Sequence, residues 1–242
     1  MDAITITANV DPRDIENDNR SIYIWLDLLG FSDFVNDGTK YRELADHLKK
    51  FQSIFMESDN YITNIISDGI ILRITKPKRI LQSEFTSILK EVAEKQFRFI
   101  KENRVFIRGG IAVGTKLEDS DDSNNLYISN GLAKAVKIEG SFVNWPVIGT
   151  KREVIDDIKD LLDIHEETTF GMKKAFNMRG EELYFIDFIT PDKDYYQLLN
   201  IKMDEHKDSA SIRNKYLWLM RYYHHSCDDA YTLDAVYEKV VL

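Results

Sequence analysis

Asp27 and Asp68 are the residues whose type and position most directly suggest chemistry. Asp27 ends an apolar segment, 21–28, where a carboxylate is costly unless it is paired or bound to a metal. Asp68 joins two β-rich segments, 61–67 and 69–74. Two carboxylates that converge repel each other unless a cation lies between them, and oxygen ligands suit Mg²⁺ or Mn²⁺. The alternatives are that Asp27 caps a helix or forms a core salt bridge, and that Asp68 is only a turn residue.

Arg108 is the third candidate, because it lies within the apolar segment 105–113. A guanidinium in such a strand needs an anion, and its planar shape allows two bonds to one phosphate. A salt bridge to a core carboxylate would satisfy it equally. The neighbouring Gly109 and Gly110 would permit close backbone approach or form a β-bulge.

The residues after Asp27 add a possible phosphate cradle. Gly30 permits a tight turn, and the amides of Phe31 and Ser32 would then point back toward any group held by Asp27. The sequence therefore predicts an anion-binding site next to the metal site.

The elements that must position these residues follow a readable order. Aromatic and β-branched residues predict strands over 21–28, 61–67, 69–74 and 105–113, and a helical period predicts helices over 39–56 and around 85–100. The Asp68-Gly69 joint predicts a hairpin. This order predicts an α+β, ferredoxin-like split βαβ fold, an antiparallel sheet with helices on one face.

The second half predicts additions to that fold. We expect a helix over 131–139 capped by Asn130, strands over 145–148 and 183–188, and a C-terminal helical embellishment over 211–226. The polar segment 118–125 is interpreted as a solvated loop. On the last helix, Lys215 and Arg221 could reach phosphates or be solvated, and His224 and His225 are expected at the surface.

Four segments, in order, resemble the motifs of class III nucleotidyl cyclases. The stretch 25–32 is similar to the phosphate-binding and first metal motif, and 66–69 to the second metal hairpin. The stretch 108–114 is similar to a strand whose arginine contacts phosphate. The stretch 131–139 is similar to the helix that supplies an asparagine and an arginine to the transition state. The resemblance covers about residues 20–145 and implies one cyclase domain over 1–242.

The resemblance implies roles for individual residues. Asp27, Leu28 and Asp68 would hold two metal ions per site, Mn²⁺ or Mg²⁺, and Phe31, Ser32 and Arg108 would bind phosphate. Alignment on Glu139 puts Lys137 at the arginine position and Ala133 at the asparagine position. Asn64 replaces the adenine-selecting lysine, and its amide can pair with uracil or cytosine. Tyr41 or Phe51 could wall off the base, or belong to the core.

The chain most resembles the pyrimidine cyclases of bacterial Pycsar anti-phage systems. The grounds are its small size, the Asp-Leu-Leu-Gly-Phe form of the first motif and the aromatic segment 215–224. That family implies conversion of UTP, or alternatively CTP, to a cyclic nucleotide that activates a separate effector. It also implies a homodimer with sites at the interface, Lys137 coming from the partner. A catalytically silent nucleotide-binding domain is the main rival, and a diguanylate cyclase or polymerase-like domain is disfavoured because no Gly-Gly-Asp/Glu-Glu-Phe loop occurs.

Composition limits the remaining classes of function. A net charge of −9 argues against a bulk nucleic-acid binder but not against a small anionic substrate. The sole cysteine, Cys227, allows no internal disulfide and fits a reducing compartment. The first residues lack the basic stretch and apolar core typical of a signal peptide, and no apolar run approaches about 20 residues, so we expect a cytoplasmic protein with no membrane segment.

Overall fold

The computed structural model describes residues 20–31, 41–74, 81–115 and 129–227. Its first half contains β1 (Arg20–Leu28), α3 (Tyr41–Met56), β2 (Ile62–Ile66), β3 (Gly69–Ile74), α4 (Gln82–Asn103) and β4 (Ile107–Thr115). Its second half contains α5 (Asn130–Ser141), β5 (Ile148–Lys151), α6 (Arg152–Leu162), β6 (Lys173–Phe176), β7 (Glu182–Phe185), α7 (Lys193–Glu205) and α8 (Ala210–Cys227).

The strands form one seven-stranded sheet in the order β2-β3-β1-β4-β5-β7-β6. The first four pair antiparallel, with Leu26 opposite Ile70 on one side and Asp27 opposite Arg108 on the other. The order of these strands and of α3 and α4 confirms the α+β, split βαβ prediction. The sheet is mixed rather than antiparallel, because β4 and β5 run parallel.

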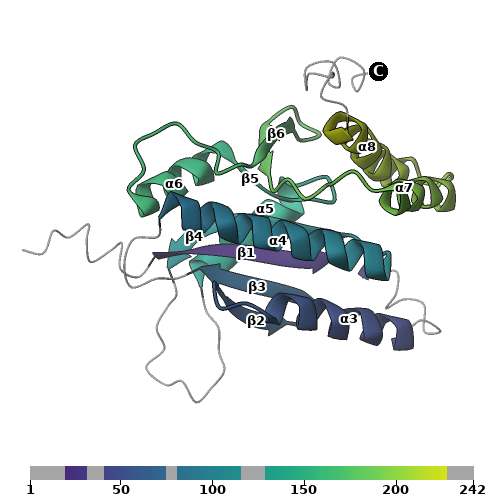
Figure 1. The fold of residues 1–242 in the computed structure, drawn as a ribbon, viewed down its shortest axis with the longest axis horizontal. Helices are drawn as coiled ribbons and strands as arrows, with labels where there is room; N and C mark the ends of the chain where they lie inside the picture. The colour runs from purple at the N-terminus through teal and green to yellow at the C-terminus, as the bar shows by residue number, and fades with distance from the viewer. Residues whose placement is uncertain (1–19, 32–40, 75–80, 116–128, 228–242) are drawn as a thin grey trace, which may run out of the picture.

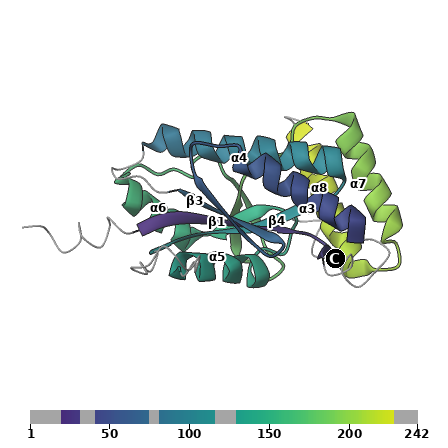
Figure 2. The same cartoon turned by 90° about the horizontal axis from the view of Figure 1, so that it is seen from below.

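Helices cover both faces of the sheet, and the prediction of one covered face was wrong. Figures 1 and 2 show α3 and α4 on one face and α5 on the other. The first face is lined by residues that are fully buried, such as Ile24, Leu26 and Ile70. On the second face, a Cβ at Gly110 would overlap the carbonyl oxygen of Ala135 in α5, so a glycine is required for this close packing.

The second half departs from the prediction in detail. The cap of α5 is Ser129, whose hydroxyl accepts hydrogen bonds from the amides of Gly131 and Leu132. Asn130 instead accepts one from the Thr115 amide at 2.8 Å. The strand expected over 145–148 begins only at Ile148, and α6, α7 and β6 were not predicted. The segment 118–125 lies outside the described residues.

The helical pair α7 and α8 packs beyond the C-terminal ends of β1 and α4 (Figures 1 and 2). Phe97 of α4 contacts Tyr195 of α7 with ring centroids 5.3 Å apart, and Lys101 pairs with Asp192 at 2.5 Å. None of the described helices is both long enough and apolar enough to cross a bilayer.

Candidate functional site

A cavity of about 560 Å³ opens at the C-terminal end of β1. Its walls come from the end of β1 with the turn that follows, the β2–β3 turn, the start of β4, and the helices α7 and α8. The lining residues are Asp27, Leu28, Leu29, Gly30, Phe31, Asp68, Arg104, Val105, Phe106, Arg108, Lys202, Glu205, His206, Ile212, Lys215 and Tyr216. The cavity is therefore where the predicted metal and phosphate residues meet.

Asp27 is half-buried on this wall and has an unusual acidity. Burial, with the nearby charges of Glu139 and Asp68, raises the pKa of its carboxyl to about 7, although Arg108 and the Leu28 amide act in the opposite direction. A carboxylate so destabilised favours either a proton or a cation. Asp68, distant in the chain, lies close enough to contribute to this shift, as the two-carboxylate prediction requires.

The turn that carries Asp68 lies one residue earlier than predicted. The pairing of Ile66 with Gly69 leaves Ser67 and Asp68 as the turn residues, and Ser67 takes the left-handed conformation with φ 55°. Gly69 belongs to β3, where a Cβ would overlap the ring of Trp25. The hairpin prediction is confirmed, but the glycine serves close packing rather than the turn.

The segment after Asp27 turns as predicted. Gly30 has φ 86°, a backbone conformation that residues with a side chain rarely adopt. The Leu29 amide donates a hydrogen bond to the Phe106 carbonyl at 2.8 Å. This bond fixes the turn against the start of β4. Phe31 lines the cavity, whereas Ser32 lies outside the described residues.

Arg108 forms an ion pair with Glu139, which α5 presents to the same side of β4. The Glu139 side chain is only 8% exposed, and burial raises its pKa although Arg108 opposes the shift. The pair matches the structural alternative considered for Arg108, a salt bridge to a core carboxylate. Because Arg108 also lines the cavity, Glu139 holds the guanidinium at its edge.

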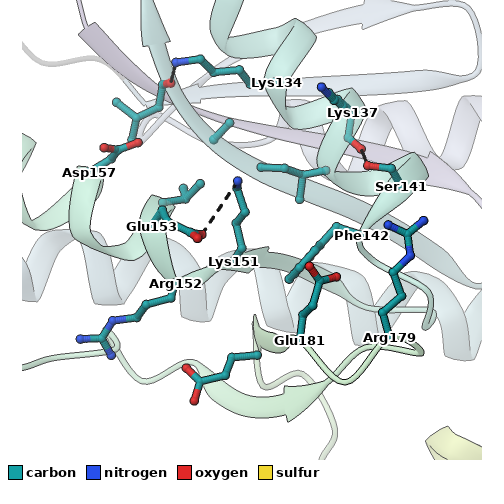
Figure 3. Close-up of a pocket in the computed structure, with 15 residues that line it drawn as sticks. Lys134, Lys137, Ser141, Phe142, Lys151, Arg152, Glu153, Asp157, Arg179 and Glu181 are labelled. Atoms are coloured by element: carbon teal, nitrogen blue, oxygen red, sulfur yellow. Dashed lines mark hydrogen bonds and ion pairs between the residues drawn. The ribbon is translucent and has the colours of Figure 1, made fainter.

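Other predicted residues lie away from this cavity. Lys137 is exposed on α5 and lines a separate cavity of about 710 Å³ with Lys134, Lys151 and Arg179. Figure 3 shows these cations on the wall of that second cavity. The structure of one chain thus does not bring Lys137 to the two aspartates.

The predicted base-reading residues are also separate from the cavity. Asn64 is half-buried on β2, and its Oδ1 atom accepts no hydrogen bond. Tyr41 is 57% exposed at the start of α3. Phe51 is a core residue that packs against Phe55 and Phe99, so the alternative of a core role is confirmed for it.

The contribution of α7 and α8 was largely missed by the sequence interpretation. Lys202 pairs with Glu205 at 2.8 Å, and the rings of His206 and Tyr216 stack with centroids 5.7 Å apart. Lys215 of α8, considered only as an optional phosphate contact, lines the cavity beside Arg108 and Glu139. The local sequence pattern predicts the helix α8 but not the part of the fold against which it packs. This wall of the cavity therefore depends on contacts between distant parts of the chain.

The donor set suits a metal ion that the protein shares with a substrate. Among the described residues, no three His, Cys, Asp or Glu side chains converge into a complete metal site. The two carboxylates, of which Asp68 helps to raise the pKa of Asp27, do fit a hard cation whose remaining ligands are phosphate oxygens and water. Asp27 and Asp68 would hold such an ion.

The acidity of Asp27 predicts how the stability of the metal-free protein changes with pH. The pKa is about 7 in the folded state and near 4 in the unfolded state, so the folded state binds more protons between these values. Stability should fall as pH rises from about 4 to about 7, and the loss is complete above 7. After a discount for solvent screening, we expect about 1–2 kcal/mol.

Urea unfolding in a chelator at pH 5, 6, 7 and 8 measures this effect. Asp27→Asn should become progressively more stable than the parent across the series. Asp59→Asn, the same change at an exposed position, is the matched control. A constant difference for Asp27→Asn would contradict the raised pKa.

Comparisons with known proteins give structural neighbours only. No family model and no curated protein matches the chain. Among solved structures, the adenylyl cyclase CyaB from P. aeruginosa is similar at 14% identity and a TM-score of 0.49, covering 72% of this chain and 96% of that one. The guanylyl cyclase Cya2 follows at 12% identity and a TM-score of 0.47, covering 72% of this chain and 94% of that one. A bacterial light-regulated adenylyl cyclase has 11% identity and a TM-score of 0.46, covering 81% and 57% respectively. Similarity at this level carries no conclusion about activity, which the chemistry of the cavity must supply.

Proposed function

We propose that this protein is a nucleotide cyclase that converts UTP to 3′,5′-cyclic UMP and pyrophosphate. The observation that carries the proposal is that Asp27 and Asp68, from separate parts of the chain, line one cavity together with Arg108. Paired carboxylates beside cationic side chains provide what a metal-bound triphosphate needs. The cavity volume, about 560 Å³, lies within the range of small-molecule sites.

The reaction forms and breaks bonds within the substrate and requires no covalent bond to the protein. The ribose 3′-oxygen loses its proton and bonds to the α-phosphorus, while the bond from that phosphorus to the bridging oxygen breaks and releases pyrophosphate. Divalent ions, Mn²⁺ or Mg²⁺ held by Asp27 and Asp68 with Leu28 as a further candidate ligand, would supply charge neutralisation and a more acidic 3′-hydroxyl. Arg108 would hold the phosphates, and Phe31 would close the wall beside them.

Selection of a pyrimidine is supported by Asn64. Its Oδ1 atom is buried without a hydrogen-bond donor, which is costly unless a ligand supplies one. A uracil or cytosine edge can pair with an amide, so CTP is the alternative substrate. In the proposed homodimer, Asn64 and Tyr41 of one subunit would serve the partner's site.

A homodimer would also explain the position of Lys137. This lysine is exposed on α5 and remote from the aspartates of its own chain, so only a second subunit could bring it to the substrate. There it would neutralise charge that develops on the phosphate. The cyclic product would act as a second messenger in anti-phage defence, read by a separate effector.

A catalytically silent nucleotide-binding domain is the second candidate. It is favoured by Ala133 at the position of the family's asparagine and by the engagement of Arg108 with Glu139. Either feature would weaken transition-state stabilisation without preventing binding.

Incubation with each of the four ribonucleoside triphosphates tests both candidates. We expect the purified protein with Mn²⁺ to form cyclic UMP and pyrophosphate in equal amounts from UTP, with less product from CTP and little from ATP or GTP. Chromatography with mass detection measures the products, and a chelator should abolish them. If no cyclic nucleotide forms but UTP still binds, the silent domain replaces the cyclase.

A further inference from the structure

Helix α8 carries a lysine into the cavity from the C-terminal part of the fold. Lys215 lies three residues after Ile212 and four before Leu219, so it occupies a position on the buried stripe of the helix. Ile212 and Tyr216 line the cavity beside it, and Leu219 is fully buried. Burial of a lysine on such a stripe lowers the stability of the fold unless an anion compensates its charge.

The helix that carries this lysine is firmly docked. The Trp218 ring stacks on Trp145 with centroids 5.3 Å apart and planes 5° from parallel. Tyr216 meets Phe106 edge to face at 5.1 Å, and Tyr222 meets Phe185 at 5.0 Å. These contacts tie α8 to the start of β4 and to β7, so the backbone of Lys215 has a defined position relative to Arg108.

Among the described residues, the ammonium group of Lys215 has only Glu139 as a nearby carboxylate influence, and it forms no ion pair with it. Burial, followed by the nearby Arg108, lowers its pKa, and Glu139 only partly offsets this. Glu139 is engaged by Arg108, and no described side chain forms an ion pair with Lys215. Another cation of the cavity, Lys202, does have a partner in Glu205. Lys215 and Arg108 thus place two positive charges side by side, an arrangement suited to a polyanion.

We propose that Lys215 is a substrate-binding residue that holds the polyphosphate end of the nucleoside triphosphate together with Arg108. The inference rests on the proposed function, because it assumes that a triphosphate occupies this cavity. The ammonium would contact the phosphates that leave as pyrophosphate, while Asp27 and Asp68 serve the metal-bound part of the substrate. The alternative is that Lys215 only supports packing through its aliphatic stem.

Replacement by methionine separates these roles, because methionine keeps an unbranched stem and removes the charge. If Lys215 serves only packing, Lys215→Met should leave phosphate binding unchanged, because methionine preserves the stem contacts. If it serves binding, removal of a half-buried charge should leave the melting temperature unchanged or raise it, while affinity falls. Lys215→Arg keeps the charge and should retain most of the affinity.

Calorimetric titration of the full chain with tripolyphosphate, in a chelator and at low salt, is the direct measurement. We expect Lys215→Met to weaken binding about 10-fold or more, in line with the loss of a charge-assisted hydrogen bond. The matched control is Lys207→Met, which removes the same charge from an exposed position outside the cavity and should change affinity less than twofold. With UTP and Mn²⁺, KM should rise more than kcat falls.

The outcomes separate this inference from the cyclase proposal. Binding by Lys215→Met within twofold of the parent, or no binding of tripolyphosphate by the parent, overturns the role of Lys215. A parent that makes no cyclic nucleotide, yet loses tripolyphosphate affinity on Lys215→Met, overturns the cyclase and retains the phosphate contact. Equal losses of tripolyphosphate affinity in Lys215→Met and Lys207→Met would show that the effect comes from net charge alone. That result would also overturn the role of Lys215.

Discussion

Asp27→Asn and Asp68→Asn should each lower the rate of UTP cyclisation by about a thousandfold or more while leaving the fold intact. Each substitution removes one of the two carboxylates that line the cavity, and an amide is a much weaker ligand for Mn²⁺ or Mg²⁺. The fold should persist because neither side chain supports the core. Rates are measured as cyclic UMP formed per minute at saturating UTP and Mn²⁺.

The stability of the same variants is measured alongside their rates. Asp27 is costly to ionise, so Asp27→Asn should be at least as stable as the parent at pH 8, although it is inactive. Asp59→Asn, an exposed aspartate outside the cavity, should keep the parental rate. Cyclisation at the parental rate by either cavity variant would show that the two aspartates do not hold the metal.

Gly110→Ala should destabilise the protein by about 2–4 kcal/mol, the largest effect on stability that we predict. The added Cβ would overlap the carbonyl oxygen of Ala135 and lie 2.8 Å from the amide nitrogen of Glu139. Both are backbone atoms of α5, so the helix as a whole must move away from β4. Because Glu139 moves with it, the ion pair with Arg108 should be lost as well.

Gly140→Ala is the matched control on the same helix. A Cβ at Gly140 meets no atom within 4 Å, and alanine is the better helix former, so this variant should gain up to about 1 kcal/mol. Chemical unfolding at pH 7 compares the three proteins. Gly110→Ala as stable as the parent would contradict the close packing of α5 on β4.

The sheet core could be predicted because its signals are local. The apolar segments that become β1 and β4, and the glycine-containing hairpin between β2 and β3, carry their patterns within a few residues. The order of these elements then restricts the topology to very few arrangements. Hence the approach of Asp27 to Asp68 was predictable, although the turn residues were misplaced by one.

The rest of the site depends on contacts between distant parts of the chain. The partner of Arg108, Glu139, comes from a helix 31 residues later, and only packing of α5 on β4 brings them together. Lys215 reaches the cavity through the docking of α8 on Phe106 and Trp145. Its place on the buried stripe of α8 was the available signal, since a lysine among apolar positions indicates a required charge. Ser129 was missed as the cap because Asn130 beside it is an equally good capping type.

The tryptophans provide a spectroscopic signal that reports whether α8 is packed on the rest of the fold. The chain has three, and two of them form the parallel Trp145–Trp218 stack between the β-sheet side of the fold and α8. Both indoles are buried, and aromatic side chains held in fixed tertiary packing give a near-ultraviolet circular dichroism signal. The third, Trp25, covers Gly69 beside the turn that presents Asp68. Detachment of the last helix would therefore register as a loss of near-ultraviolet signal, with no attached dye and no turnover.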